Sequence, residues 1–371
     1  MYKRQVPFTA DLVEPTRQFN TRLRGHGITI FQAEEDPVIT HELDGPHPIT
    51  RENFVVVDDK ANSVCGSYSM VYMDFLVRGE ERRTGFIQIP ISEGIINPKY
   101  VPVGIMILKD AFARSPLSFG LGMGGRGQPV TKLHVLLKAK VEDVPFFFRV
   151  CHAGPFLENL DLLRKSPAKR AAAKVARWTG LGALGAGAVH LVRGGPVRLP
   201  RGLQVEPVRD FSGWADELWR EARGAYTLAM VRDSSVLNFL YEPQGGRFHC
   251  LRLLRGAKTT GWAALLDTQM REHNHFHNMR VGTIVDQFSL PGEEAAVIGA
   301  ATHFLARRGV DLIVSNQLHP AWRGAFATCG YLSGPSNFVL SRSPAFYQQS
   351  ADPAGERVHI TRGDGDGPWN L

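Results

Sequence analysis

The sequence lacks a long apolar run and a leader-like start. No stretch of about 18 or more strongly apolar residues occurs in its 371 residues, which excludes an ordinary membrane-spanning helix. The first residues, MYKRQVPFTADLVEPT, contain two basic side chains but no apolar segment behind them, unlike a secretory signal. We therefore expect a soluble, cytoplasmic protein.

Cysteine is scarce, and no two cysteines are close together. The four are Cys65, Cys151, Cys250 and Cys329. This spacing argues against a disulfide framework and a structural zinc site, so we expect reduced, buried thiols and no bound metal. His273, His275 and His277 alternate and would share one face of a strand as a candidate metal cluster. Only Glu272 offers a carboxylate nearby, which favours an ordinary loop.

Acidic residues are absent from one long segment. Between Arg164 and Arg201 there are nine basic residues and no acidic one. Subtracting these nine charges from the net +7 leaves −2 for the rest of the chain, so the basicity belongs to this segment and a nucleic-acid partner is not expected. The segment could lie on an anionic membrane surface or form a solvated helix packed against one domain.

The sequence contains two halves with the same order of elements. A chain of 371 residues exceeds one hydrophobic core of the usual size, which favours two domains. Each half has a strand, a proline-containing break, a helix, a strand, a second helix and a last strand. In the first half these lie at 82–92, 103–115, 117–124, 129–140 and 144–150. In the second half they lie at 279–290, 293–309, 310–316, 319–330 and 337–342.

Apolar spacing supports these assignments in the second half. Val297, Ala301 and Phe304 recur at four- and three-residue steps, which places them on one helical face, and Gly309 follows as a helix-ending residue. The next run, VDLIVSN, is short and apolar, as expected for a strand covered on both faces. The order β-α-β-α-β predicts an α/β sheet in each half.

Three motifs of the second half carry further information. The first is an Arg-Asp…Leu-Asn…Tyr pattern at Arg232, Asp233, Leu237, Asn238 and Tyr241. The second is the hairpin-like FHCLRLLRGAKTTGWAALLD, and the third is an Asn…Ala…Gly-Tyr ending at Asn316, Ala325, Gly330 and Tyr331. With the order of elements, these motifs resemble the core of the GNAT superfamily of N-acyltransferases. The resemblance covers residues 203–345 and, less closely, 50–160.

The resemblance implies an α/β (α+β) fold with two tandem GNAT-like domains, each a mixed central sheet flanked by helices. The implied ranges are an N-terminal domain at 1–163, a basic linker at 164–202, a C-terminal domain at 203–345 and a tail at 346–371. It further implies a bacterial N-acyltransferase that transfers an acyl group from acetyl-CoA or another acyl-CoA to an amine acceptor, such as a small-molecule amine or an amino sugar.

Two other functions are compatible with tandem halves of this kind. Such halves are also similar to FemABX-type transferases, which would use aminoacyl-tRNA and bind it through the basic linker. A catalytically degenerate tandem fold that binds or scaffolds a partner is the second alternative.

The resemblance places the acyl-CoA pyrophosphate at the start of the second half's long helix, because helix N-termini offer N–H donors. The implied cofactor-binding residues there are Ser289, Leu290 and Gly292. However, Glu293 and Glu294 follow where the family has a glycine-rich loop, and these carboxylates would repel phosphates. The first half has residues 97–104 at this place, with Lys99 and no acid.

Phe326 is the fourth implied cofactor-binding residue. Many members of the family have a tyrosine at this position, where it can protonate the departing thiolate of CoA. Phenylalanine cannot donate a proton, although a thiolate can leave without an acid.

Asp286 is the predicted general base. It lies mid-strand on a largely apolar face, where a carboxylate could have a raised pKa. Pairing with an arginine such as Arg280 is the alternative. Asn316 and His319 follow a buried strand, at the edge where α/β folds commonly bind ligands, and are predicted to orient the reactants. Helix capping by Asn316 and an ordinary surface position for His319 are the alternatives.

Two further segments could approach the site. Residues 120–127 are the densest run of glycine, and could hold an anion or form a tight loop. The tail could fold back onto the domain cleft through Arg362 and Trp369.

Overall fold

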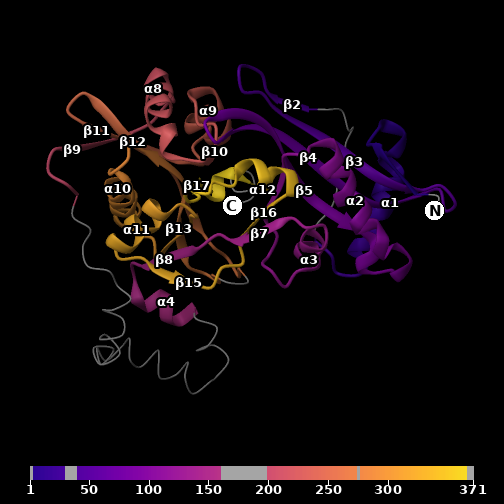
Figure 1. Ribbon diagram of the computed structural model, residues 1–371. Helices are drawn as coiled ribbons and strands as arrows, with labels where there is room; N and C mark the ends of the chain where they lie inside the picture. The colour runs from indigo at the N-terminus through magenta and orange to yellow at the C-terminus, as the bar shows by residue number, and fades with distance from the viewer. Residues whose placement is uncertain (1–2, 30–39, 160–198, 274–275, 366–371) are drawn as a thin grey trace. The chain divides into compact units, whose positions relative to one another are not determined.

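The computed structural model describes residues 3–29, 40–159, 199–273 and 276–365. The chain forms two compact units. The N-terminal unit comprises residues 1–143, 226–231 and 336–356, and the C-terminal unit comprises residues 144–225, 232–335 and 357–371. Each unit contains a mixed sheet with helices packed on it, so the predicted fold class is confirmed (Figure 1).

The sheet of the N-terminal unit has the strand order β1-β3-β4-β5-β6-β16-β7. β2 also pairs with β3, and β10 pairs with β4. β5 and β6 form a parallel pair. The strands are β1 Lys3–Pro7, β2 Thr40–Leu43, β3 Ile49–Asp58, β4 Ser63–Val77, β5 Glu80–Ser92, β6 Ser118–Gly122, β7 Lys140–Asp143, β10 Leu228–Met230 and β16 Val339–Arg342. The α-helices are α1 Val13–Arg24, α2 Val101–Arg114, α3 Pro129–Leu136 and α12 Pro344–Ser350.

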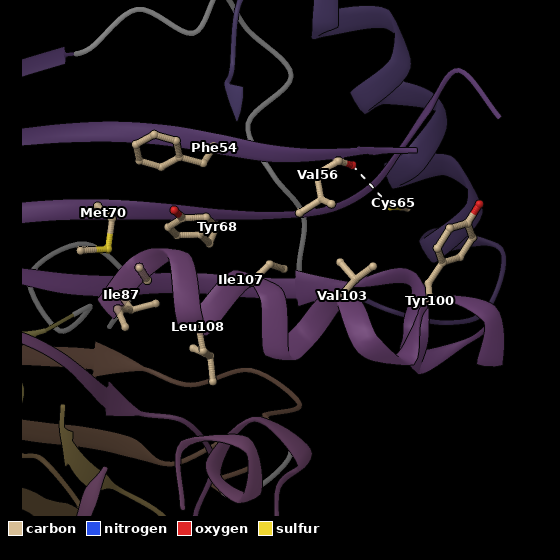
Figure 2. Close-up of a cluster of buried hydrophobic side chains, with 11 residues drawn as sticks. Phe54, Val56, Cys65, Tyr68, Met70, Ile87, Tyr100, Val103, Ile107 and Leu108 are labelled. Carbon is tan, nitrogen blue, oxygen red and sulfur yellow. Dashed lines mark hydrogen bonds between the residues drawn. The ribbon is translucent and has the colours of Figure 1, made fainter. Parts of the chain in front are cut away.

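Helices α1 and α2 pack on opposite faces of this sheet, because successive strand residues point to opposite faces. Val56 of β3 lies in the buried core that Val103 and Ile107 of α2 complete (Figure 2). The adjacent Val55 points to the other face, into a core with Phe19 of α1. The helix predicted at 103–115 is thus observed as α2, with its apolar residues buried against the sheet.

The C-terminal unit has a seven-stranded sheet in the order β15-β8-β14-β13-β12-β11-β9. Only β13 and β14 are parallel. Its strands are β8 Phe146–Val150, β9 Leu203–Pro207, β11 His249–Arg255, β12 Lys258–Gln269, β13 Arg280–Ser289, β14 Leu312–Asn316 and β15 Leu332–Gly334. The short strand β17 Val358–His359 also belongs to this unit but not to this sheet. The helices are α4 Ala153–Asn159, α8 Gly213–Ala222, α9 Ser234–Tyr241, α10 Glu294–Arg307, α11 Pro320–Thr328 and the short 3-10 turn Arg362–Asp364.

The two faces of this sheet are covered by different helices. Trp219 of α8 packs on Phe288 of β13, with ring centroids 5.4 Å apart. On the other face, Gly261 of β12 lies so close to α10 that an added Cβ would be 2.5 Å from the Val297 side chain. As predicted, α10 ends just before Gly309, which has a φ of 80°.

Each sheet contains a strand from the opposite half of the sequence. β16 lies between β6 and β7 of the N-terminal sheet, and β8 lies between β14 and β15 of the C-terminal sheet. The two units therefore differ in extent from the expected ranges 1–163 and 203–345, and the expected tail is divided between them. The predicted linker lies outside the described residues as far as residue 198, so its membrane and RNA roles stay predictions.

In each sheet, the hydrogen-bonded pairing between the two parallel strands covers only part of their length. β5 pairs with β6 only at Gly85 and Phe86, and β13 pairs with β14 only as far as Ile284. Each of β5 and β13 then carries a bulge, at Ile89 with a φ of 49° and at Val285. We call the two places the N-terminal split and the C-terminal split. At both places the backbone ladder between the two parallel strands is interrupted.

Within the described ranges, no helix is both long and apolar enough to cross a bilayer. The same ranges contain no group of three or more side chains arranged to hold a metal ion. His273 and His277 face each other in an antiparallel backbone bridge, so these two do not lie along one strand; His275 lies outside the described residues. Burial raises the pKa of Cys65 and of Cys250 to about 12, which leaves these thiols protonated.

Candidate functional site

A buried network of charged and polar side chains lies at the C-terminal split. Its members, all almost fully buried, are Arg232, Tyr241, Asp286, Thr361 and Asp364. Arg232 donates to both oxygens of Asp286 at 3.1 Å and to Asp364 at 2.8 Å. The hydroxyls of Tyr241 and Thr361 donate to Asp286 at 2.8 Å and 2.9 Å. The network links α9, β13 and the C-terminal residues of the unit.

This geometry makes Asp286 the counter-ion of a buried arginine. The carboxylate accepts five hydrogen bonds, because the backbone N–H of Gln287 adds one at 2.9 Å. A bidentate guanidinium stabilises the charged form, and no position is left for the proton of an amine. The base role of Asp286 stays a prediction that would require the network to open. The alternative, pairing of Asp286 with an arginine, is confirmed, but the partner is Arg232; Arg280, the arginine named as an example, binds Asp267 at 2.7 Å.

Two carboxylates in the network share one guanidinium. Burial raises the pKa of Asp364 to about 6, and the Asp286 charge adds to this effect, whereas Arg232 opposes it. Burial disfavours the charged form of Arg232, but Asp286 and Asp364 together outweigh it and raise the arginine pKa. The network therefore holds a carboxyl group that titrates near pH 6.

Replacing Asp364 by Asn is expected to change how stability depends on pH. The folded-state pKa of Asp364 is raised from 3.8 to about 6, so its contribution is fully present below about pH 4 and is lost as the pH rises through 6. Relative to D364N, the wild type should lose unfolding free energy as the pH rises from about 4 to 7. Urea unfolding from pH 4 to 7 measures the difference, with the exposed Asp210→Asn as control. A wild-type-minus-D364N difference that is constant with pH would contradict the assignment.

The C-terminal segment, residues 358–364, crosses the C-terminal split from one strand to the other. Its Thr361 binds β13 through Asp286, as described above. Beyond the end of β14, the backbone N–H of Leu318 donates to the carbonyl of Ile360 at 3.2 Å. Arg362 donates to the side-chain oxygen of Asn316 at 2.9 Å. The C-terminal segment thus fills the place where β13 and β14 no longer pair.

The C-terminal segment fits tightly at this place. A Cβ added to Gly363 would lie 2.2 Å from the Tyr241 hydroxyl, so only glycine fits there. His359 is fully buried, between the rings of Phe288 and Trp322. The contact of Arg362 with Asn316 confirms the predicted return of the tail, whereas Trp369 lies outside the described residues.

Asn316 and His319 lie where the sequence places them, at the end of β14 and the start of α11. Asn316 is buried; its amide also donates to the carbonyl of Val144 at 3.2 Å, so it does not cap a helix. His319 is 7% exposed, so a surface position is wrong. Burial, with a smaller effect of Arg357, lowers the pKa of His319 to about 4 and keeps it neutral. The orienting roles of both residues stay predictions.

The start of α10 is occupied by atoms of the chain itself. The N–H of Leu290 donates to the carbonyl of Thr260 at 3.0 Å, and the N–H of Gly292 donates to the Glu294 carboxylate at 2.8 Å. The Ser289 hydroxyl donates to the adjacent carbonyl at 2.9 Å. The implied phosphate donors are therefore satisfied internally, and the carboxylate confers the wrong charge for a pyrophosphate. Cofactor binding by these residues stays a prediction.

Phe326 is part of an aromatic stack in the core of the C-terminal unit. Its ring is fully buried and stacks on Phe147, with centroids 4.7 Å apart and an angle of 5° between the planes. Tyr331 contacts it edge-on at 5.0 Å. Core packing alone therefore accounts for a phenylalanine at position 326, and no contact with a ligand is needed to explain it.

The start of α2, which follows the N-terminal split, differs in charge from the start of α10. The first turn of α2 contains no acidic residue and no side chain caps it. Val101, its first residue, is 58% exposed. The ammonium of Lys99 binds Asp58 at 3.1 Å and the Tyr100 hydroxyl at 3.2 Å. The N–H of Val101 donates to the carbonyl of Pro98, and Pro102 has no N–H, so what distinguishes this helix start from that of α10 is the absence of an acidic residue in its first turn.

The glycine-rich run at 120–127 forms the end of β6 and a tight turn. Gly122, Met123, Gly124 and Gly125 all have positive φ values, which a turn of this kind requires. The carbonyl of Gly125 accepts hydrogen bonds from the N–H of Gln128 and the hydroxyl of Thr131. The run therefore forms the tight loop that was one of its two interpretations.

The sequence identified part of the buried network. Arg232 and Tyr241 belong to the first GNAT-like motif, but their partners were not assigned from it. Thr361 and Asp364 were missed, although Thr-x-x-Asp is a recognisable capping pattern: the Thr361 hydroxyl accepts from the N–H of Gly363, and Asp364 accepts from the N–H of Thr361.

Comparison with known proteins relates this architecture to solved structures. No protein-family model and no curated protein sequence matches the chain. A probable N-acyltransferase from Enterococcus faecalis V583 superposes with a TM-score of 0.51 and 10% identity, over 94% of this chain and 74% of that one. A GCN5-related N-acetyltransferase from Anabaena variabilis ATCC 29413 gives 0.52 and 9%, over 92% and 72%. Identities this low show the fold alone. The chain is therefore a GNAT-fold protein.

Proposed function

We propose that the protein is an N-acyltransferase that moves an acyl group from an acyl-CoA to an amine, and that the acyl-CoA binds in the N-terminal unit. The GNAT fold supports acyl transfer as the general chemistry. One observation carries the choice of unit: the C-terminal split is filled by the chain's own C-terminal segment, which binds Asp286 and Asn316. The acidic start of α10 agrees with this choice.

The chemistry needs little from acidic or basic side chains. A thioester is already activated towards amines, so positioning of the two reactants and polarisation of the carbonyl provide most of the acceleration. The proposed places for the thioester and the phosphates are the interrupted ladder at the end of β5 and the acid-free first turn of α2. The buried network then has a structural role: it holds the C-terminal segment across the other split.

Replacing Val101 by Glu is expected to weaken the binding of coenzyme A by about 10-fold or more, or ~1.4 kcal/mol. A carboxylate at the first position of a helix is favourable for folding, but it repels a pyrophosphate at the same helix end. Calorimetric titration with coenzyme A measures the effect.

Two variants serve as matched controls for Val101→Glu. Gly213→Glu places the same charge at the first position of α8, where a Cβ meets no neighbour, and should bind coenzyme A like the wild type. Glu294→Gln removes the acid at the start of α10. If the C-terminal unit held the phosphates, E294Q would tighten binding and V101E would have no effect, and this pair of results would overturn the choice of unit.

A further inference from the structure

Helix α3 of the N-terminal unit has apolar side chains on both its packed face and its exposed face. The packed face includes Leu133, which lies against the core formed with α2. The exposed face includes Val135, which is 56% exposed, and Leu136, which is 63% exposed. Among the described residues, only two other large apolar side chains, Ile95 and Val101, are exposed to a comparable degree. Two adjacent apolar side chains at the surface of a short helix indicate a contact with a partner.

The exposed face of α3 also carries positive charge. Lys132 is exposed and precedes Val135 and Leu136 by three and four residues, which places it beside them on the helix surface. Lys138 and Lys140, both exposed, follow the end of the helix. Within the part of the chain that the structure describes, no carboxylate forms an ion pair with Lys132 or Lys138. The exposed apolar pair is therefore accompanied by lysines whose charge is not neutralised.

The sequence around α3 contains no acidic residue. None occurs between Asp110 and Glu142, a stretch that includes all of β6 and α3. The two acids that bound the stretch are paired: Asp110 binds Arg114 at 2.7 Å, and Glu142 binds the buried Arg342. A partner that matches this surface must therefore offer an apolar interior and a negatively charged boundary.

We propose that the surface formed by Lys132, Val135, Leu136 and Lys138, which we call the α3 face, docks on an anionic lipid bilayer; this inference does not depend on the proposed function. Val135 and Leu136 enter the boundary between the headgroups and the acyl chains, and the two lysines lie at the negatively charged headgroups.

The size and the charge of the α3 face favour a bilayer over a protein partner. A bilayer has no fixed shape to match, whereas a specific protein interface buries roughly 800 Å² on each partner, far more than two apolar side chains offer. A second copy of this chain is disfavoured as well. A two-fold interface places the same patch of both copies together, and Lys132 and Lys138 would then meet the same lysines of the other copy.

Co-sedimentation of the full-length protein with vesicles tests this docking. The vesicles contain phosphatidylcholine and phosphatidylserine at about 7:3, and pure phosphatidylcholine vesicles serve as the uncharged comparison. Replacing Val135 and Leu136 together by Ser should weaken binding to the charged vesicles by about 10-fold or more, because the apolar area that enters the bilayer is lost. Replacing Lys132 and Lys138 together by Gln should weaken it by about fivefold per lysine.

A matched control and a local probe accompany these variants. Lys258→Gln removes a lysine that is 56% exposed in the C-terminal unit, and it should bind the charged vesicles like the wild type. Leu136→Trp reports the position of the contact: lipids with brominated acyl chains should quench its fluorescence more than that of the wild type, whose six tryptophans give the baseline. Thermal unfolding of all variants should match the wild type, because the replaced side chains are exposed.

Two results would overturn the inference. If the wild type and the variants of the α3 face bind the charged vesicles equally well, and L136W is quenched no more than the wild type, another part of the chain makes the contact, such as the basic segment between Arg164 and Arg201. If the wild type does not sediment with the charged vesicles, the α3 face serves a different partner. Neither result bears on the proposed function, because the vesicle experiments contain no coenzyme A.

Discussion

Replacing Arg232 by Met is expected to lower the free energy of unfolding by about 3–5 kcal/mol, one of the two largest effects that we expect. The substitution leaves the carboxylates of Asp286 and Asp364 buried without their counter-charge. Breaking a buried ion pair by removing one partner is costly, because the remaining charge is desolvated and unpaired. Urea unfolding at neutral pH measures the loss, with fluorescence and circular dichroism as separate probes.

A matched control distinguishes burial from the mere loss of an ion pair. Lys258 binds Glu221 at 2.6 Å in the same unit, but both side chains are more than half exposed. Lys258→Met should cost less than about 1 kcal/mol. Arg232→Lys should fall between the two, since it keeps the charge but not the bidentate geometry. A cost for R232M no larger than that for K258M would show that water reaches the network and that its role is not structural.

Separating the two halves of the sequence is expected to abolish folding of each half. A fragment of residues 1–163 lacks β16, which leaves β6 and β7 without the strand between them. A fragment of residues 203–371 lacks β8, which leaves β14 and β15 unpaired in the same way. Losing a central strand exposes two rows of backbone polar groups and part of both core faces.

Co-expression should restore both units, because each fragment then supplies the strand that the other lacks. The measurement is co-purification of an untagged fragment 203–371 with a tagged fragment 1–163, followed by thermal unfolding of the complex. A control with a tag alone excludes binding to the resin. A cooperative unfolding transition of the isolated fragment 203–371 would show that this unit folds without β8. That result would contradict the claim that each unit needs the strand contributed by the other half of the sequence.

The elements of the fold could be predicted from the sequence, but the pairing of two strands could not. Apolar spacing and Gly309 placed α10, and VDLIVSN is β14, because these signals are local. The runs 144–150 and 337–342 have equally clear strand character. Nothing in a strand's own sequence specifies which sheet it joins, so the exchange of β8 and β16 depends on contacts between residues far apart in the chain.

The candidate site shows the same limit. Alternation correctly placed Asp286 on a buried face of β13, but its partner Arg232 is 54 positions away in the sequence, and no periodicity relates them. The sequence also shows the acids at the start of α10, and the structure places the Glu294 carboxylate on the N–H of Gly292.

The most direct test of acyl-CoA binding by this chain is the thermal stability of the full-length protein with coenzyme A, acetyl-CoA and a long-chain acyl-CoA. A ligand at about 100 times its dissociation constant adds roughly 2.7 kcal/mol to native stability. We expect stabilisation by the acyl-CoA compounds with one binding site per chain, and the ranking of acyl chain lengths would identify the donor. No stabilisation by any of the three compounds would contradict the proposed function and favour a GNAT-fold protein that binds a different ligand or a partner.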